Sequence, residues 1–190
     1  MDLSEPTRIP DQTLAELIGE VIVPQLPGAL FFDFYRKIKG RPPSDTLPYM
    51  ISGLDPGETT GVSRWTRVGD QFSIQAFQIN TSIIEWGVDK FQIIIRPSPG
   101  SCVVIEDYKV YAWKAKQHAW ASLLVPRLIG VAETFCRLGS VPLVKQMAQQ
   151  GKAFAADEKL EQWGLYIPGR PHANDATRHV CQLLLFGEWK

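Results

Sequence analysis

The sequence predicts an α/β protein in which a mixed β-sheet carries helices on its faces. Short apolar runs alternate along the chain with longer segments whose apolar residues recur at helical spacing. Two runs that alternate apolar and polar residues, 61–68 and 72–76, are separated by Gly69-Asp70, which indicates a β-hairpin. The predicted order is three strands, then helix, strand, helix, strand, helix and helix.

The strands outside the hairpin are predicted from short apolar segments rich in β-branched residues. Residues 50–54 form an apolar run that leads into a turn. Residues 101–106 form a second run, which we expect in the centre of the sheet. Residues 141–144 are the last predicted strand.

The helices are predicted from apolar periodicity and from the residues at their ends. Thr81 is the expected N-cap of a first helix. The apolar face of that helix carries Ile84, Val88, Phe91 and Ile95. A long helix over 120–138 contains Pro126, which predicts a kink or a split, and a further helix covers 154–163. The last helix is expected to begin near Asp175. Its inward face carries Ala176, Val180, Leu183 and Leu184.

Residues 1–47 are predicted to form a helical N-terminal extension, and residues 48–190 the main domain. A helical pattern begins after Pro10, and a second apolar segment over 29–35 runs into a basic cluster. That cluster consists of Arg36, Lys37, Lys39 and Arg41. Because the second segment is rich in aromatic residues, we expect it to pack on the main domain or on a partner subunit.

The bulk composition gives no support for a nucleic-acid-binding protein, because 20 basic and 20 acidic residues leave the 190-residue chain with no net charge. Any such surface must be local. The three cysteines lie far apart in apolar runs and are expected to be buried, reduced thiols. The N-terminus lacks a signal-peptide pattern and the apolar runs are too short to cross a membrane, so a soluble cytoplasmic protein is expected.

Three acidic residues each lie at the end of a predicted buried element: Asp55 after the first strand, Glu106 after the strand at 101–106, and Asp175 at the start of the last helix. Each alone has an ordinary interpretation, as a turn residue, a solvated strand end or a helix cap. Together, however, they follow the order of an α/β sheet, where functional groups gather at the carboxyl ends of strands. Clustered carboxylates suit a hard cation, so this order favours a Mg²⁺ or Mn²⁺ site.

The segments around these acids resemble the RuvC-type Holliday junction resolvases, a family with the ribonuclease-H-like fold. Residues 53–61, Gly-Leu-Asp-Pro-Gly-Glu-Thr-Thr-Gly, are similar to the first-strand motif of that family, and residues 104–106, Val-Ile-Glu, to its second acidic strand. Residues 172–179, His-Ala-Asn-Asp-Ala-Thr-Arg-His, resemble the closing motif in the version found in small phage-encoded resolvase-like proteins. The resemblance covers roughly residues 49–187 and leaves the N-terminal extension outside.

The resemblance implies a ribonuclease-H-like nuclease domain that binds two divalent ions, Mg²⁺ or Mn²⁺, about 4 Å apart. It implies that Asp55 bridges both ions, with Glu106 on one side and Asp175 on the other. The family commonly has an aspartate where this chain has His172, a softer ligand, so we expect a preference for Mn²⁺. Residues 146–152 resemble the segment that places a base near the cleaved phosphate, which implies that role for Lys152. A helix-flanking histidine and an ordinary surface lysine are the alternatives.

A basic segment supplies the local charge that the whole chain lacks. No acidic residue occurs between Asp107 and Glu133, and aromatic residues are interleaved with the bases, a composition suited to phosphate contact and base stacking. The residues expected to contact nucleic acid are Lys109, Lys114, Lys116, Arg127 and Arg178. A solvated loop with core aromatics is the alternative, and the cluster from Arg36 to Arg41 is a second candidate contact.

The predicted function is divalent-metal-dependent cleavage of branched DNA. The resemblance implies Holliday junction resolution by a homodimer in a bacterial or phage-infected cell. One alternative is a ribonuclease-H-like nuclease with another substrate, of the terminase or RNA-processing type. An actin-like or sugar-kinase-like ATP-binding domain has a similar first turn, but it needs a second domain and a second glycine-rich loop, which this sequence lacks. A non-catalytic DNA-binding relative is disfavoured because all three acids are present.

Overall fold

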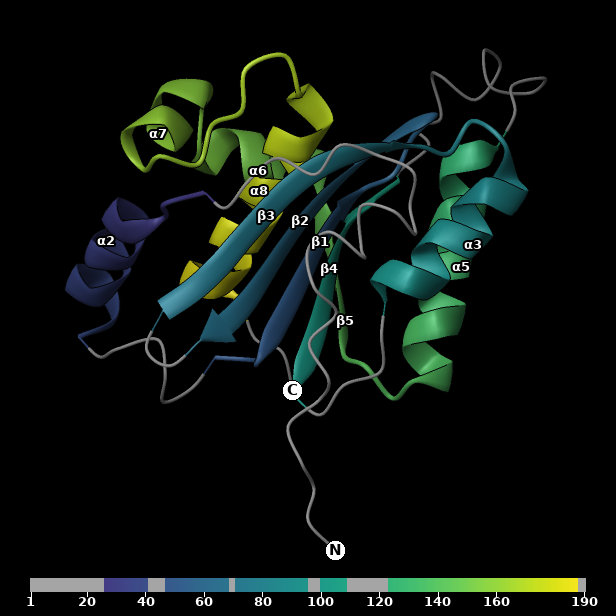
Figure 1. Cartoon of the computed structure of the whole chain (residues 1–190), viewed down its shortest axis with the longest axis horizontal. Helices are drawn as coiled ribbons and strands as arrows, with labels where there is room; N and C mark the ends of the chain where they lie inside the picture. The colour runs from purple at the N-terminus through teal and green to yellow at the C-terminus, as the bar shows by residue number, and fades with distance from the viewer. Residues whose placement is uncertain (1–25, 41–46, 69–70, 96–99, 109–122, 188–190) are drawn as a thin grey trace, which may run out of the picture.

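The computed structural model describes residues 26–40, 47–68, 71–95, 100–108 and 123–187. Its centre is a twisted five-stranded sheet in the order β3-β2-β1-β4-β5 (Figure 1). The strands are β1 (Met50–Asp55), β2 (Thr59–Val68), β3 (Gln71–Asn80), β4 (Ser101–Asp107) and β5 (Leu143–Met147). The helices are α2 (Ala29–Lys39), α3 (Ile84–Ile94), α5 (Leu124–Leu138), α6 (Ala148–Phe154), α7 (Asp157–Gln162) and α8 (Pro171–Phe186).

Antiparallel and parallel pairing meet at β1. β1, β2 and β3 form an antiparallel meander in which Asp55 lies opposite Gly61. β4 pairs in parallel with the other side of β1, and β5 pairs in parallel with β4. Leu54 is registered with Ile105, so Asp55 and Glu106, the next residues along, end neighbouring strands at the same edge. Because side chains alternate along a strand, both acids point away from the face that buries Leu54 and Ile105.

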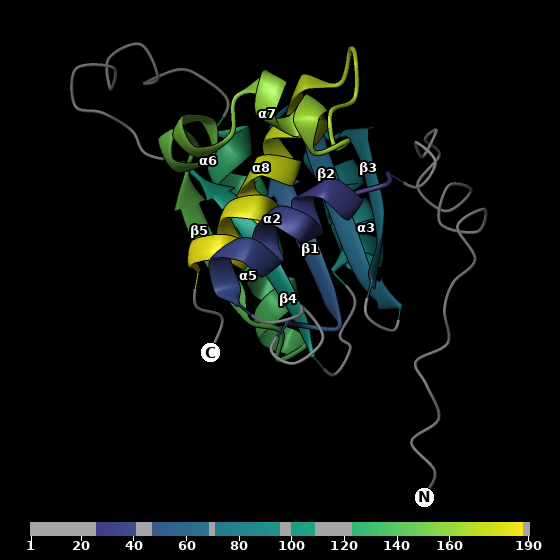
Figure 2. The same ribbon diagram turned by 90° about the vertical axis from the view of Figure 1, so that its left-hand side faces the viewer.

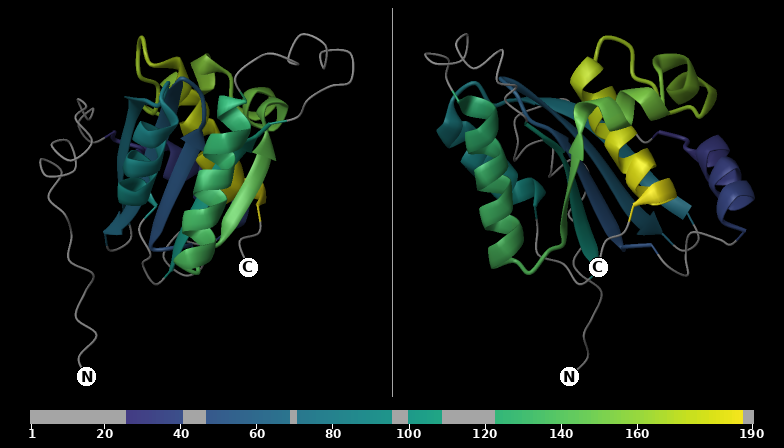
Figure 3. Two further views of the ribbon diagram at one scale, coloured as in Figure 1. Left: turned by 90° about the vertical axis from the view of Figure 1, so that its right-hand side faces the viewer. Right: turned by 180° about the vertical axis from the view of Figure 1, so that it is seen from behind.

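Helices cover both faces of the sheet. α3 and α5 lie side by side over one face, where Leu54, Phe91 and Leu128 belong to the same core (Figure 3). α8 crosses the other face, with α6 and α7 near its start and α2 on its outer side (Figure 2). The core on that face includes Ile51 and Val180. Asp55 and Glu106 therefore point toward the face that α8 covers.

The described part of the N-terminal segment packs on the α8 side of the sheet. Phe31 is fully buried, and its ring meets Trp65 and Trp163 edge to face with ring centroids 5.3 and 5.1 Å away. The apolar segment at 29–35 thus covers the main domain, as expected from its aromatic content. The helix expected after Pro10 lies outside the described residues, and the domain boundary at residue 47 stays a prediction.

Two helices begin at positions that differ from the prediction. α8 begins at Pro171 rather than near Asp175, because proline is well suited to the first turn, where its missing N–H has no partner to lose. α5 begins at Leu124, so Pro126 also lies in a first turn and the helix is continuous through it. The kink or split predicted at Pro126 is therefore wrong.

Three further elements differ in detail. Ile83 rather than Thr81 precedes the first turn of α3, and Thr81 is fully buried. The helix predicted over 154–163 begins later, as α7 at Asp157, and Phe154 instead ends α6, because the backbone is extended at Ala155 and Ala156. The strand predicted from residue 141 begins at Leu143, and β1 rather than β4 is the central strand.

The three cysteines are free and buried, as expected. Burial raises the pKa of the Cys102 and Cys136 thiols to about 12. A raised pKa disfavours the thiolate form, which is the reactive form of cysteine. No helix in the described part of the chain is long and apolar enough to span a membrane.

Candidate active site

The candidate site starts at the turn that follows β1. Asp55 is the last residue of β1 and is 7% exposed. The turn after it is held by Thr81, whose hydroxyl donates to the carbonyl of Gly57 and lies 2.6 Å from the hydroxyl of Thr60. These bonds tie the Asp-Pro-Gly turn to the start of β2 and the end of β3, which fixes the position of the Asp55 carboxylate.

Two glycines allow α8 to approach the sheet closely. A Cβ added at Gly53 in β1 would lie 2.5 Å from a carbonyl oxygen of α8, and a Cβ at Gly61 in β2 would overlap the carbonyl oxygen of His172. Gln78 on β3 accepts a hydrogen bond from the backbone N–H of His172 at 3.1 Å. The first turn of α8 therefore lies directly against the strands, beside Asp55.

Two of the three acids contact basic or histidine side chains that the sequence also singles out. Oδ2 of Asp55 lies 2.8 Å from Nδ1 of His172. Oδ2 of Asp175 lies 3.2 Å from Nζ of Lys152 on α6, and the same carboxylate pairs with Arg178. His172 and Lys152, which the sequence singles out, therefore each contact one of the three acids.

Glu106 has a partner that the sequence analysis did not find. His179 is 1% exposed, with Nε2 3.1 Å from Oε2 of Glu106 and Nδ1 2.9 Å from Oε1 of Gln146 on β5. His172, Asp175 and His179 are spaced at i, i+3 and i+7, which places them on one face of α8. This spacing would have predicted that His179 belongs to the site. It predicts this only if the helix is known to begin before residue 175.

The three acids share one electrostatic environment. The pKa of Asp55 is raised from 3.8 to about 6, first by burial and then by the negative charges of Glu106 and, to a smaller extent, Asp175. The hydrogen bond and charge of His172 act in the opposite direction. His172 contacts Asp55 and His179 contacts Glu106, and Asp175 lies between these histidines on the same face of α8. The structure brings together the three acids that the sequence predicts.

Arg178 is an internal residue and not an exposed one. Its side chain is 8% exposed, Nε donates to the carbonyl of Ala155 at 2.6 Å, and the guanidinium pairs with Asp175 and Asp157. Because these donors already face internal acceptors, the side chain has a structural role, and its contact with nucleic acid stays a prediction. Arg178 connects α8 to α7 and holds Asp175.

Of the other expected nucleic-acid contacts, the structure describes only Arg127. Lys109, Lys114 and Lys116 fall outside the described residues. Arg127 is exposed on α5, which covers the face of the sheet opposite α8. Lys152, whose side chain is 62% exposed, is a basic residue that the structure places beside Asp175.

The chemistry of the donor set fits a hard divalent cation. No three His, Cys, Asp or Glu side chains within the described ranges are already arranged around a common point that could hold a metal ion. Asp55, Glu106 and Asp175 are instead turned toward the basic and imidazole partners described above. Carboxylate oxygens are nevertheless the preferred ligands of Mg²⁺ and Mn²⁺, and a cation would offset both the burial and the repulsion that raise the pKa of Asp55.

Comparison with solved structures identifies the fold. The structure of Thermus thermophilus RuvC is similar with a TM-score of 0.52 at 15% sequence identity, over 72% of this chain and 94% of the RuvC chain. RuvC from the same organism in complex with a Holliday junction substrate gives a TM-score of 0.54 at 16% identity, with the same coverage. The chain has the RuvC fold. The predicted ribonuclease-H-like α/β class is therefore confirmed.

The likeness to RuvC is visible in structure rather than in sequence. The yeast mitochondrial Holliday junction resolvase is a further similar structure, with a TM-score of 0.49 at 10% identity over 93% of this chain and 91% of that chain. No protein-family model and no curated protein matches the sequence. The sequence resemblance to the RuvC family is therefore confined to the short motifs around the three acids.

Proposed function

We propose that this protein is a divalent-metal-dependent endonuclease that cleaves branched DNA, with the Holliday junction as its substrate. The observation that carries the proposal is that α8 brings Asp175 to the edge of the sheet where Asp55 and Glu106 contact His172 and His179 of the same helix, in a RuvC fold. One of the similar structures is RuvC in complex with a Holliday junction substrate, which supports the choice of branched DNA over other nucleic acids.

Asp55, Glu106 and Asp175 would hold the divalent ions, with His172 as a further donor. Bound ions of this kind activate water and stabilise charge on a phosphodiester. The chain's own contribution is to position the ligands: His179 holds Glu106 at 3.1 Å, and Arg178 holds Asp175. A ligand whose orientation is fixed by such partners loses less conformational freedom on binding.

Lys152 is the residue that we assign to the cleaved phosphate. Its Nζ lies 3.2 Å from Asp175, and its side chain is 62% exposed, so the ammonium can contact the carboxylate and a DNA phosphate from the same position. An ammonium has three donors and can serve both oxygens at once. A cation placed where negative charge develops stabilises the transition state of phosphodiester cleavage.

A cleavage panel tests the proposed function. The full-length protein is incubated with Mg²⁺ or Mn²⁺ and labelled four-way, flap, duplex and single-stranded DNA, while light scattering measures its mass. We expect paired incisions in the four-way junction, and a mass of two chains, because two paired cuts require two sites in a fixed relation. A monomer that resolves junctions would contradict the homodimer. Failure to cut any substrate with either ion would overturn the whole proposal.

Replacing His172 with aspartate is expected to move the metal preference from Mn²⁺ toward Mg²⁺, because the change restores an all-oxygen donor set. The parent protein should cleave faster with Mn²⁺, and the ratio of the two rates should fall about tenfold or more in the variant. Initial rates are measured over a concentration series of each ion. An unchanged ratio would place His172 outside the metal site and leave it only as the hydrogen-bond partner of Asp55.

A further inference from the structure

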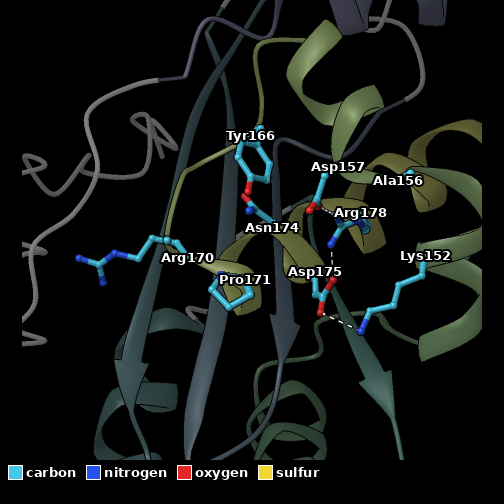
Figure 4. Close-up of a pocket in the computed structure, with 10 residues that line it drawn as sticks. Lys152, Ala156, Asp157, Tyr166, Arg170, Pro171, Asn174, Asp175 and Arg178 are labelled. Carbon is cyan, nitrogen blue, oxygen red and sulfur yellow. Dashed lines mark hydrogen bonds and ion pairs between the residues drawn. The ribbon is translucent and has the colours of Figure 1, made fainter.

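A pocket lies directly beside the candidate active site. It has a volume of about 530 Å³ and is formed by α6, α7, the segment before α8 and the first turns of α8 (Figure 4). Lys152 and Asp175 belong both to this pocket and to the candidate site. A nucleic-acid strand whose phosphate contacts Lys152 is therefore within reach of the pocket at the adjacent nucleotide. Pockets of this size accommodate small organic groups such as a nucleobase.

The walls of the pocket favour stacking over hydrogen-bonded recognition. Tyr166 presents a half-buried aromatic ring and Pro171 an exposed one (Figure 4). The buried amide of Asn174 is already bonded to the backbone of Ile167, at 2.9 Å through Oδ1 and 3.0 Å through Nδ2. Because the polar groups at the floor are already engaged, the pocket offers a ring surface that suits any base.

The charge around the pocket suits the phosphates on either side of such a base. Arg170 lines this pocket and also a second, polar hollow at the start of β2 and the end of β3. The guanidinium of Arg170 has no hydrogen-bond or ion-pair partner within the described residues, and in Figure 4 it extends away from Lys152. The two cations thus lie on different sides of Tyr166 and can contact different phosphates.

We propose that this pocket receives the nucleobase next to the cleaved phosphodiester, turned out of the base stack and placed on the ring of Tyr166. Lys152 and Arg170 contact the phosphates that flank it. The inference rests on the proposed nuclease function and adds a binding subsite to it. Turning a base out of the stack costs least where pairing is already disturbed, so this pocket favours a branched substrate over an intact duplex.

The test combines variants of the pocket with a substrate that lacks one base. An abasic analogue is placed, one position at a time, in the nucleotides on either side of the mapped cut in a four-way junction. The parent protein should cleave one of these junctions about tenfold more slowly than the intact junction, since base–aromatic stacking contributes an effect of that size. Tyr166→Ala should cleave the intact junction more slowly by a similar factor. Its cleavage rate should not depend on whether the base is present.

Two matched variants separate stacking from folding. Tyr166→Phe keeps the ring and should behave like the parent protein. Trp86→Ala removes a ring that is 46% exposed on α3, on the other side of the sheet, and should also leave cleavage unchanged. If Tyr166→Ala fails to fold, Ala156→Trp decides the question, because it fills the pocket from an exposed position at the start of α7.

The possible results separate this inference from the proposed function. Equal sensitivity to the missing base in the parent and in Tyr166→Ala, or no sensitivity at any position, would overturn the pocket as a base-binding subsite while leaving the nuclease in place. Loss of the base effect in both Tyr166→Ala and Ala156→Trp supports the inference. A parent protein that cuts no junction at all would overturn the proposed function, and the subsite with it.

Discussion

Replacing Asp55 with asparagine is expected to lower the rate of DNA cleavage by about a thousandfold. The amide keeps the shape of the side chain but removes the charge that binds a divalent ion. Glu106→Gln and Asp175→Asn should have effects of similar size, because each removes one member of the same carboxylate set. The measurement is single-turnover cleavage of a labelled four-way junction. Junction affinity should change little, since contacts from basic residues to phosphates dominate it and these variants keep all of them.

The stability of Asp55→Asn gives an independent check on the same site. Asp55 is a buried carboxylate whose pKa is raised by burial and by Glu106, so removing its charge should leave the melting temperature unchanged or raise it. Added Mn²⁺ should stabilise the parent protein by mass action and stabilise the variant less. An exposed acid on α3, replaced in Asp89→Asn, is the matched control and should alter neither property. Parent-like cutting by all three acid variants would show that the assignment is wrong.

The positions of Asp55 and Glu106 can be predicted from sequence because each lies at the end of a strand. Asp55 and Glu106 follow short apolar runs, and parallel strands bring such ends to one edge. The β2–β3 hairpin is equally local, since two alternating segments flank Gly69-Asp70 and pair as expected. In these cases the pattern depends only on neighbours along the chain, which is why the sequence alone predicts it.

The partners of the acids could not be predicted in the same way, because they depend on where α8 begins and how it lies on the sheet. A helix that begins near Asp175 leaves His172 outside it and hides the common face of His172 and His179. From the sequence alone, Arg178 is expected to be an exposed cation. In the structure, the extended backbone at Ala155 turns a carbonyl oxygen toward its side chain. Each difference comes from a tertiary contact between segments far apart in the chain.

The close approach of α8 to the sheet leads to the second large expected effect, in Gly61→Ala. We expect this change to destabilise the protein by about 3 kcal/mol, at the upper end of overpacking effects, and to remove most of the cleavage activity. The added Cβ would overlap the carbonyl oxygen of His172 and lie 2.8 Å from the backbone nitrogen of Ala173. Backbone atoms cannot yield by changing rotamer, so the first turn of α8 must move away from β2.

Movement of that turn would carry His172 and Asp175 away from Asp55, which is why stability and activity should fall together in Gly61→Ala. Urea unfolding measures the stability. Cleavage under conditions where the variant stays folded measures the activity. Gly130→Ala in α5 is the matched control: a Cβ there meets no atom within 4 Å, and alanine should stabilise the helix by up to about 1 kcal/mol. A Gly61→Ala protein as stable as the parent would show that α8 does not lie directly against β2. A destabilised variant that still cleaved at the parent rate would show that the distance between α8 and Asp55 does not control the chemistry.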